Sequence, residues 1–428
     1  MNKHDMDTEA SAGGACSEFA NLSRRGFLGS TAAVGATSIS QLAFGGGRGS
    51  DRANDVLVVI FLRGGMDGLT TVVPYGDADL YNARPTLAIN PPGQTDGALD
   101  LDGFFGLPPA CASLLPAFQQ GDLAFVHAAG STDPTRSHFN AMYSMETGTP
   151  NMGQTTITDG WIGRHLQTIA PSGSGELRAL AIQSILPRSM SGGPGAIPAK
   201  DPDDFDFPGE PVLAGALRSV IESSYARAAE PLKGAASSSF GAIDLLATVD
   251  FANYQPANGA VYPAGDFGTK LVDVAAMIKA DIGLECIEVD IPQWDHHSAM
   301  GPVNGILALK LADLSAGLNA FHKDLAAELG HVTVVVKSEF GRRVAENGSA
   351  GTDHGHGGVM MVLGGNVNGG QVHGQWPGLD PASLGNGDLP ITTDYRDVLA
   401  EILSLRLGST SIADVFPQHT PQFPGIVS

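Results

Sequence analysis

The chain has 428 residues, enough to bury a large core in one or more domains. Acidic residues outnumber basic ones by 45 to 24, and the resulting net charge of −21 argues against binding to nucleic acid or to anionic lipid. A hydrophobic content of 43% argues against a disordered chain.

The segment 22-LSRRGFLGSTAAVGATSISQLAFGG-46 has the layout of an export signal. Paired Arg24 and Arg25 precede an apolar stretch, from Phe27 to Phe44, that carries no charge. The pattern looks like a twin-arginine signal, and its richness in Gly, Ser and Thr disfavours a membrane span. We therefore expect residues 1–48 to be signal peptide and linker, recognised by the twin-arginine export machinery. The mature protein is then periplasmic or secreted, without a stable membrane span; the alternative is a chance arginine pair before a buried helix.

Two cysteines, Cys111 and Cys286, remain in the expected mature chain. They can pair in an oxidising compartment or stay as buried free thiols, and the sequence leaves both alternatives open. So few cysteines exclude a cysteine-based metal site.

Six apolar runs recur after the signal, each followed by a loop rich in glycine or polar residues. Their β-branched residues show no polar alternation, which is typical of strands buried on both faces of a sheet. The predicted strands are 55–62, 122–130, 178–183, 284–291, 331–338 and 358–365.

Helical patterns alternate with these runs. The predicted helices are 110–121, 135–146, 211–229, 267–283, 303–330 and 394–408. Alternating strands and helices favour an α/β fold with a mainly parallel sheet covered on both faces. We expect one such domain over residues 50–428. The stretch 184–265 breaks the rhythm and is predicted to be an inserted cap that contributes to binding.

Candidate site residues follow the predicted strands, because ligands of such sheets bind at the carboxyl ends of the strands. The first strand leads to Asp67, and the second leads to 131-STDPTRSHFNAM-142, where a helix begins at Ser137 and His138. The later strands lead to Asp295 and His297 in 294-WDHH-297, Glu339 in 338-SEFGR-342, and Asp353, His354 and His356 in 351-GTDHGHGG-358.

Imidazole and carboxylate groups at one edge suit Zn²⁺, Mn²⁺ or a similar ion, and two such ions can hold the attacking and leaving oxygens of a displacement. Glycines around His354 and His356 leave the backbone free to bring these side chains to an ion. Structural roles remain as alternatives: Asp67 can cap a turn, Ser137 can cap its helix, and 338-SEFGR-342 can form an ion pair at a strand end.

Arginines accompany these candidates, namely Arg63, Arg136 and Arg342. Planar guanidinium groups match the oxygens of phosphate or sulfate, so the arginines indicate an anionic ligand; the alternative is charge balance for the carboxylates. An oxidoreductase is disfavoured because 63-RGGMDG-68 lacks the glycine spacing of a dinucleotide-binding turn.

The twin-arginine signal, 61-FLRGGMDGL-69, 136-RSHFNAM-142, 294-WDHH-297 and 338-SEFGR-342 with 351-GTDHGHGG-358 together resemble the bacterial domain of unknown function 1501 family. The resemblance covers nearly the whole mature chain. It places the chain in the alkaline-phosphatase-like group, which also contains sulfatases and phosphonate-ester hydrolases. It implies a three-layer α/β/α sandwich with a metal site at the strand ends.

The resemblance also implies roles for single residues. Asp67 takes the place of the metal-binding carboxylate after the first strand, and Asp295 and His297 are similar to the middle ligands of the group. Glu339 stands where sulfatases have an aspartate, and His354 or His356 matches the late histidine.

The nucleophile departs from the sulfatase pattern. Sulfatases use Cys or Ser in C/S-x-P-S-R, whereas 132-TDPTR-136 offers Thr132, which cannot become formylglycine. Phosphatases of the group use Ser or Thr directly, so Ser137 or Thr132 is the expected nucleophile, with Arg136 holding the anion.

The sequence thus predicts an exported hydrolase of phosphate or sulfate esters that uses one or two divalent ions, Zn, Mn, Mg or Ca. The predicted metal ligands are Asp67, Asp295, His297, Glu339, Asp353, His354 and His356. The alternative is a non-catalytic, metal-stabilised binding or cell-envelope assembly protein.

Overall fold

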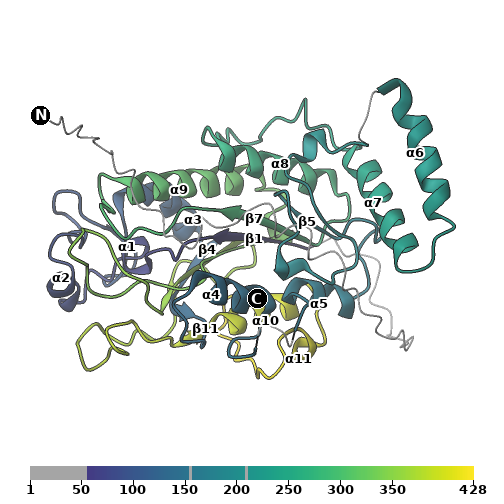
Figure 1. Cartoon of the computed structure of the whole chain (residues 1–428). Helices are drawn as coiled ribbons and strands as arrows, with labels where there is room; N and C mark the ends of the chain where they lie inside the picture. Colours follow the sequence, from purple (N-terminus) through teal and green to yellow (C-terminus); the bar gives the residue numbers. More distant parts are fainter. Residues whose placement is uncertain (1–54, 154–156, 208–210) are drawn as a thin grey trace, which may run out of the picture. The chain divides into compact units, whose positions relative to one another are not determined.

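A nine-stranded sheet forms the centre of the computed structural model, which describes residues 55–153, 157–207 and 211–428 (Figure 1). The strand order is β10-β4-β9-β8-β1-β7-β5-β6, and β11 also pairs with β4. The predicted twin-arginine segment lies outside the described residues. The strands of this sheet are β1 (Val56–Leu62), β4 (Leu123–Gly130), β5 (Ala179–Ala181), β6 (Ala196–Pro198), β7 (Cys286–Ile291), β8 (Val332–Lys337), β9 (Gly358–Gly364), β10 (Val372–His373) and β11 (Thr393–Asp394). A separate antiparallel pair joins β2 (Leu99–Asp100) to β3 (Gly106–Leu107).

Strand β1 shows why the sheet residues are apolar without alternation. All seven of its residues are buried. Val58 and Ile60 join the hydrophobic cluster on one face of the sheet, whereas Val59 and Phe61 join the cluster on the other. Successive side chains of a strand point to opposite faces, so a strand covered on both faces must be apolar throughout.

Helices cover both faces of the sheet, as Figure 1 shows. On one face lie α3 (Leu115–Gln120), α8 (Asp266–Ala280) and α9 (Ile306–Asp324), and on the other lie α4 (His138–Thr147), α5 (Trp161–Thr168), α10 (Tyr395–Leu405) and α11 (Ile412–Val415). In α9, Leu307, Leu311, Leu314 and Leu318 recur on one side of the helix and enter the same cluster as Val58. The α/β/α sandwich with a mainly parallel sheet, predicted from the sequence, is therefore confirmed.

The remaining helices lie beside this sandwich. They are α1 (Gly68–Thr71), α2 (Asp79–Ala83), α6 (Pro211–Tyr225) and α7 (Leu232–Leu246). The last two fall within residues 184–265 and pack on each other, and Arg218 of α6 pairs with Asp244 of α7 at 2.6 Å. Helix α7 is a difference from the sequence prediction, which expected only the helix at 211–229 in this stretch.

Strand β9 is the one antiparallel member among the described strands of the large sheet, pairing with β4 on one side and β8 on the other. Its amino end therefore lies at the same edge as the carboxyl ends of its neighbours. The loop before β9 carries His354, while the loops after β4 and β7 carry His138 and Asp295. This strand direction brings the three loops to one edge of the sheet.

The two cysteines lie on opposite faces of the sheet as buried free thiols. Cys111 belongs to the cluster under α3 and α9, and Cys286 to the cluster under α5 and α10. The free-thiol alternative is therefore the one observed. Within the described part of the chain, no helix has both the length and the apolar character needed to cross a membrane.

A buried group of charges lies on the sheet face covered by α4. Arg63 Nη2 contacts Glu146 Oε1 at 2.6 Å, and Arg63 Nε contacts Asp290 Oδ2 at 2.6 Å. Glu288 of β7 lies 3.6 Å from Arg63. Burial, with the charges of Asp290 and Glu146, raises the pKa of Glu288 to about 8, against the opposing effect of Lys337 and Arg63. The protonated, neutral form of Glu288 is therefore favoured in the folded protein.

This pKa predicts a pH-dependent effect of Glu288→Gln on stability. The pKa of Glu288 is higher in the folded protein than its ordinary value of 4.5. Its contribution to the free energy of unfolding is therefore fully present below pH 4.5. The contribution is lost as the pH rises through about 8. Glutamine is neutral at every pH, so the variant does not lose this contribution. The Tm of the variant minus the Tm of wild type should therefore be roughly 2–5 °C larger at pH 9 than at pH 5. Thermal unfolding of both proteins at the two pH values measures this; an equal difference in Tm at pH 5 and pH 9 would contradict the assignment.

Candidate metal centre

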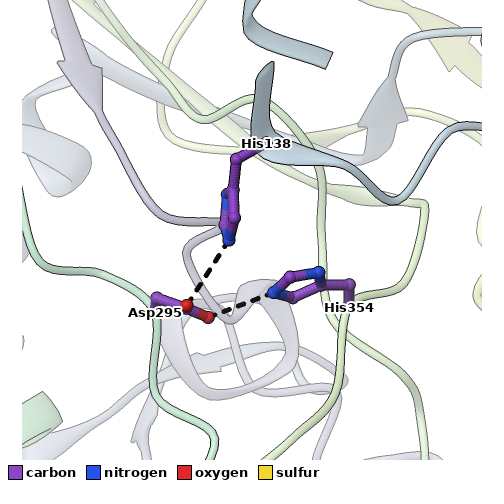
Figure 2. Close-up of side chains that lie close together, drawn as sticks. All are labelled: His138, Asp295 and His354. Carbon is purple, nitrogen blue, oxygen red and sulfur yellow. Dashed lines mark hydrogen bonds and ion pairs between the residues drawn. The ribbon is translucent and has the colours of Figure 1, made fainter. Parts of the chain in front are cut away.

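Three side chains converge at the carboxyl edge of the sheet: His138, Asp295 and His354 (Figure 2). His138 opens α4, Asp295 follows β7, and His354 precedes β9. Asp295 Oδ2 lies 3.4 Å from His138 Nε2, and Asp295 Oδ1 lies 3.2 Å from His354 Nε2. One ligand atom from each residue falls within 4.8 Å of the other two.

His297 adds a third imidazole to this group. Its Nε2 lies 3.0 Å from Asp295 Oδ1 and 2.9 Å from His354 Nε2. The side chain of His138 is fully buried, whereas that of His297 is 34% exposed. The group is therefore closed at His138 and open to solvent at His297.

Each imidazole is oriented through its Nδ1 atom. His138 Nδ1 bonds Glu339 Oε1 at 2.7 Å, His354 Nδ1 bonds the carbonyl oxygen of Arg136 at 2.8 Å, and His297 Nδ1 bonds Asp353 Oδ1 at 3.2 Å. Since these oxygens only accept hydrogen bonds, each Nδ1 carries the proton. The Nε2 atoms then face one another and the Asp295 carboxylate, an arrangement that needs either protons or a metal ion between them.

The donor set fits a divalent metal ion. Nitrogen and oxygen ligands about 2.0–2.2 Å from a tetrahedral Zn²⁺ are separated from one another by about 3.4 Å. Within the group, His138 Nε2 lies 3.4 Å from Asp295 Oδ2, the Nε2 atoms of His297 and His354 lie 3.0 and 3.2 Å from Asp295 Oδ1, and these two Nε2 atoms are 2.9 Å apart. Imidazole-rich sets favour Zn²⁺ or a similar transition metal over Mg²⁺ and Ca²⁺, which prefer oxygen ligands. The structure thus supplies donors for an ion held by His138, Asp295, His297 and His354.

Asp295 is an ionised carboxylate in this site. Burial alone would raise its pKa, but hydrogen bonds from His138 and His354 and the charge of Arg342 hold the pKa well below its usual range. Arg342 Nη2 donates to Asp295 Oδ1 at 2.6 Å and is itself buried. Because the guanidinium occupies Oδ1, Oδ2 is the oxygen better placed for a metal ion. For His138, burial alone would lower the pKa, but Asp295 and Glu339 raise it to about 9, so a metal ion that binds at Nε2 would displace a proton from it.

Glycines let the loop before β9 lie against the site. A Cβ atom on Gly355 would fall 2.3 Å from the carbonyl carbon of Arg342, and one on Gly351 would fall 2.3 Å from that of His297. Both separations are far below contact distance, so only glycine permits this approach of the backbones. Glycines here were expected to bring His354 and His356 to an ion; His354 does reach the group, whereas His356 contacts the carbonyl oxygen of Asp133 instead.

Other predicted ligands make contacts outside the central group. Asp67 is buried and binds Arg84 through both oxygens, at 2.7 and 2.9 Å, while Oδ1 also accepts from the amide of Thr70 as the cap of α1. Asp67 Oδ2 further accepts from Thr352 Oγ1 at 3.1 Å, which ties it to the loop of His354. Burial alone would raise the pKa of Asp67, but Arg84 holds it below its ordinary value. Asp67 therefore acts here as the partner of an arginine.

The other three predicted ligands, Glu339, Asp353 and His356, also hold neighbouring groups, and Asp353 Oδ1 lies 3.2 Å from His297 Nδ1. Glu339 accepts from the amide of Gly64 at 2.8 Å and from His138. His356 Nε2 lies 2.9 Å from the carbonyl oxygen of Asp133 and so steadies the loop after β4. Glu339 thus orients the ligand candidate His138. His356 contacts the backbone of the loop after β4 and does not contact the central group.

The predicted nucleophiles lie in the loop that leads into α4. Ser137 is half-buried, directly precedes His138, and its side chain makes no capping hydrogen bond to the helix. Thr132 is exposed, and its Oγ1 lies 3.4 Å from Asn151 Nδ2. The guanidinium of Arg136 forms an ion pair with Asp388. Of the two hydroxyls, that of Ser137 adjoins the metal centre in the chain.

His138 is the member of the group that the sequence analysis did not select. It stands in the same motif as Ser137 and Arg136, at the end of a predicted strand, and that position was the available signal.

Glu339 gives a test of how His138 is held. Glu339→Gln keeps an oxygen that can accept from His138 Nδ1 but removes the negative charge that makes the imidazole a stronger ligand. Loss of such a partner typically weakens metal binding 10–100-fold, and we expect a decrease in this range. Competition with a fluorescent chelator measures the affinity, and an unchanged affinity would show that Glu339 does not support the ligand.

Comparison with known proteins identifies the family. The profile described as "Protein of unknown function (DUF1501)" matches residues 54–407. None of the curated proteins matches the chain.

Several solved structures have a similar fold. The alkaline phosphatase of the Antarctic bacterium TAB5 is 8% identical, with 73% of this chain and 92% of that chain covered and a TM-score of 0.31. The lipoteichoic acid synthase LtaP of Listeria monocytogenes is 9% identical, with coverages of 79% and 74% and a TM-score of 0.32. The phosphonate monoester hydrolase of Agrobacterium radiobacter is 10% identical, with coverages of 86% and 78% and a TM-score of 0.31. Scores this low transfer neither a site nor an activity. The family match over most of the length is decisive for identity: the chain belongs to the DUF1501 family.

Proposed function

We propose that the protein is an exported, metal-dependent hydrolase of phosphate or sulfate esters. One observation carries the proposal: the Nε2 atoms of His138, His297 and His354 converge on the carboxylate of Asp295. A metal ion held by this group would supply Lewis-acid chemistry, lowering the pKa of an attacking hydroxyl or water. Export is proposed from the segment 22–46 alone.

The chain's own residues would divide the work as follows. His138, Asp295, His297 and His354 hold the ion, with His297 on the solvent side where a substrate can approach. The hydroxyl of Ser137 is the first candidate nucleophile because it is half-buried and makes no capping bond to α4. Thr132, which is exposed, is the second. Arg136 is the proposed clamp for the anionic group.

Turnover of simple esters tests this function. The purified protein is loaded with Zn²⁺ or Mn²⁺ and assayed with p-nitrophenyl phosphate and p-nitrophenyl sulfate. We expect hydrolysis that stops when a chelator removes the metal, and a fall in kcat of at least about 100-fold in Ser137→Ala. Thr132→Ala tests the second candidate: a fall of this size in Thr132→Ala, with kcat unchanged in Ser137→Ala, would assign the nucleophile to Thr132 instead.

The alternative function gives a different result in the same experiments. A non-catalytic, metal-stabilised binding or envelope-assembly protein would melt at a higher temperature with metal, because the ion binds only the folded chain. It would hydrolyse neither ester. Metal-dependent stability without turnover on a broad set of phosphate and sulfate esters would therefore replace the hydrolase proposal with this one.

A further inference from the structure

Two arginines share one buried carboxylate beside the metal centre. The side chain of Arg136 is 36% exposed and that of Arg343 is 35% exposed, whereas that of Asp388 is only 6% exposed. Arg136 forms an ion pair with Asp388 Oδ2, and Arg343 Nε lies 4.0 Å from Asp388 Oδ1. Asp388 thus anchors both guanidinium groups while leaving part of each in solvent.

The main chain of Arg136 contacts the candidate metal centre, and that of Arg343 contacts Asp353 beside it. The carbonyl oxygen of Arg136 accepts the hydrogen bond that orients His354, at 2.8 Å. The amide of Arg343 donates to the carbonyl oxygen of Asp353 at 2.9 Å, and the carboxylate of Asp353 holds His297. The backbone of Arg136 therefore contacts the ligand candidate His354, and the backbone of Arg343 contacts Asp353, the partner of His297.

The contact between Arg343 and Asp388 is incomplete. Within the described part of the chain, Asp388 Oδ1 is buried and makes no hydrogen bond, and a separation of 4.0 Å is too long for one. The nearby carboxylate of Asp353 already accepts from His297 and from Asn347. Arg343 is consequently held near the site by charge, with its hydrogen-bond donors available to another acceptor.

The charges favour an anion at this position. Two guanidinium groups share the one buried carboxylate of Asp388, while the other nearby carboxylate, that of Asp353, is 56% exposed and already engaged by His297 and Asn347. A guanidinium presents paired donors in a plane and can take two oxygens of a tetrahedral anion. Local positive charge in an acidic protein is the arrangement that attracts an anionic ligand to one place.

We propose that Arg343 is a second anion-binding side chain that acts together with Arg136, and that the pair selects phosphate or sulfate monoesters over diesters. A monoester offers three non-bridging oxygens, enough for two arginines and the metal centre, whereas a diester offers two. Asp388 is then a positioning residue that keeps both guanidinium groups at the rim. The choice of monoesters rests on the proposed hydrolase function, but the anion site itself does not.

Calorimetric titration with inorganic phosphate tests the site without turnover. We expect the metal-loaded protein to bind phosphate at least 10-fold more tightly than dimethyl phosphate. Arg343→Gln should weaken phosphate binding at least 10-fold without loss of bound metal. The matched control is Arg227→Gln, which removes the same charge from an exposed arginine after α6 and should bind phosphate as wild type does.

The outcomes separate this proposal from the proposed function. Equal phosphate affinity in the two arginine variants, no phosphate binding by wild type, or no preference over dimethyl phosphate would each overturn the proposal. Phosphate binding that depends on Arg343, in a protein that hydrolyses no ester, would keep the anion site and reject the hydrolase. If esters are hydrolysed with the same kcat/KM by Arg343→Gln and Arg227→Gln, the hydrolase function is kept and the role of Arg343 in anion binding is rejected.

Discussion

A His138→Ala variant is expected to lose its divalent metal and any metal-dependent turnover. Its Nε2 lies 3.4 Å from Asp295 Oδ2, and Glu339 fixes the proton on Nδ1, so the lone pair of Nε2 faces the proposed ion. Even loss of a supporting partner costs 10–100-fold in metal affinity, so loss of a direct ligand should cost at least about 100-fold. Calorimetric titration with Zn²⁺, together with a chelator competition, measures the affinity.

Controls for this variant must separate ligand loss from damage to the fold. His138→Gln preserves most of the side-chain volume in this fully buried position and should lose metal as well. His331→Ala removes a histidine whose side chain is 51% exposed and pairs with Asp55, and it should bind metal like wild type. Full Zn²⁺ affinity in both His138 variants would show that His138 is not a ligand.

Arg84→Met is expected to destabilise the protein by about 3–5 kcal/mol, since it removes one partner of a buried ion pair. The side chains of Arg84 and Asp67 are only 1% and 2% exposed, so the Asp67 carboxylate would stay buried without its counter-ion. Methionine fills much of the arginine's volume, which limits the effect of a cavity. Urea unfolding in the metal-loaded state measures the change, and a midpoint equal to that of wild type would contradict the structural role.

Asp67→Asn distinguishes this role from the metal-binding role that the family resemblance implied. If Asp67 serves as the partner of Arg84, the Asn variant should lose stability but keep its metal stoichiometry. The double variant Asp67→Asn with Arg84→Met should recover part of the loss, because neither buried charge is left unpaired. Loss of metal in Asp67→Asn at temperatures where the protein stays folded would restore Asp67 to the ligand set.

Six strands of the sheet could be predicted from the sequence because burial on both faces leaves a plain signal, whereas the short strands β6, β10 and β11 were not predicted. The run 55–62 became β1 (Val56–Leu62), and the run 331–338 became β8 (Val332–Lys337). Helix α9 followed from its leucine spacing in the same way. The antiparallel direction of β9 could not be read from its residues, since an apolar strand buried on both faces has the same composition in either direction.

The site was predicted in part because strand ends share an edge, although which side chains meet there depends on tertiary contacts. Asp295, His297 and His354 are brought together as the motifs suggested. The pairing of Asp67 with Arg84 could not be foreseen, because nothing in the sequence marks Arg84 as a partner 17 residues away. The same limit applies to Asp388, which contacts Arg136 across 252 residues of chain.

A crystal of the metal-loaded protein, measured at the absorption edge of the metal, tests the central claim most directly. We expect one anomalous peak about 2.0–2.2 Å from the Nε2 atoms of His138 and His354 and from Asp295 Oδ2, with His297 as the fourth ligand on the solvent side. Arg342 should keep its hydrogen bond to Asp295 Oδ1 in that crystal. A peak elsewhere, such as at Asp67, or no peak after soaking in excess metal, would contradict the metal centre and the hydrolase function proposed from it.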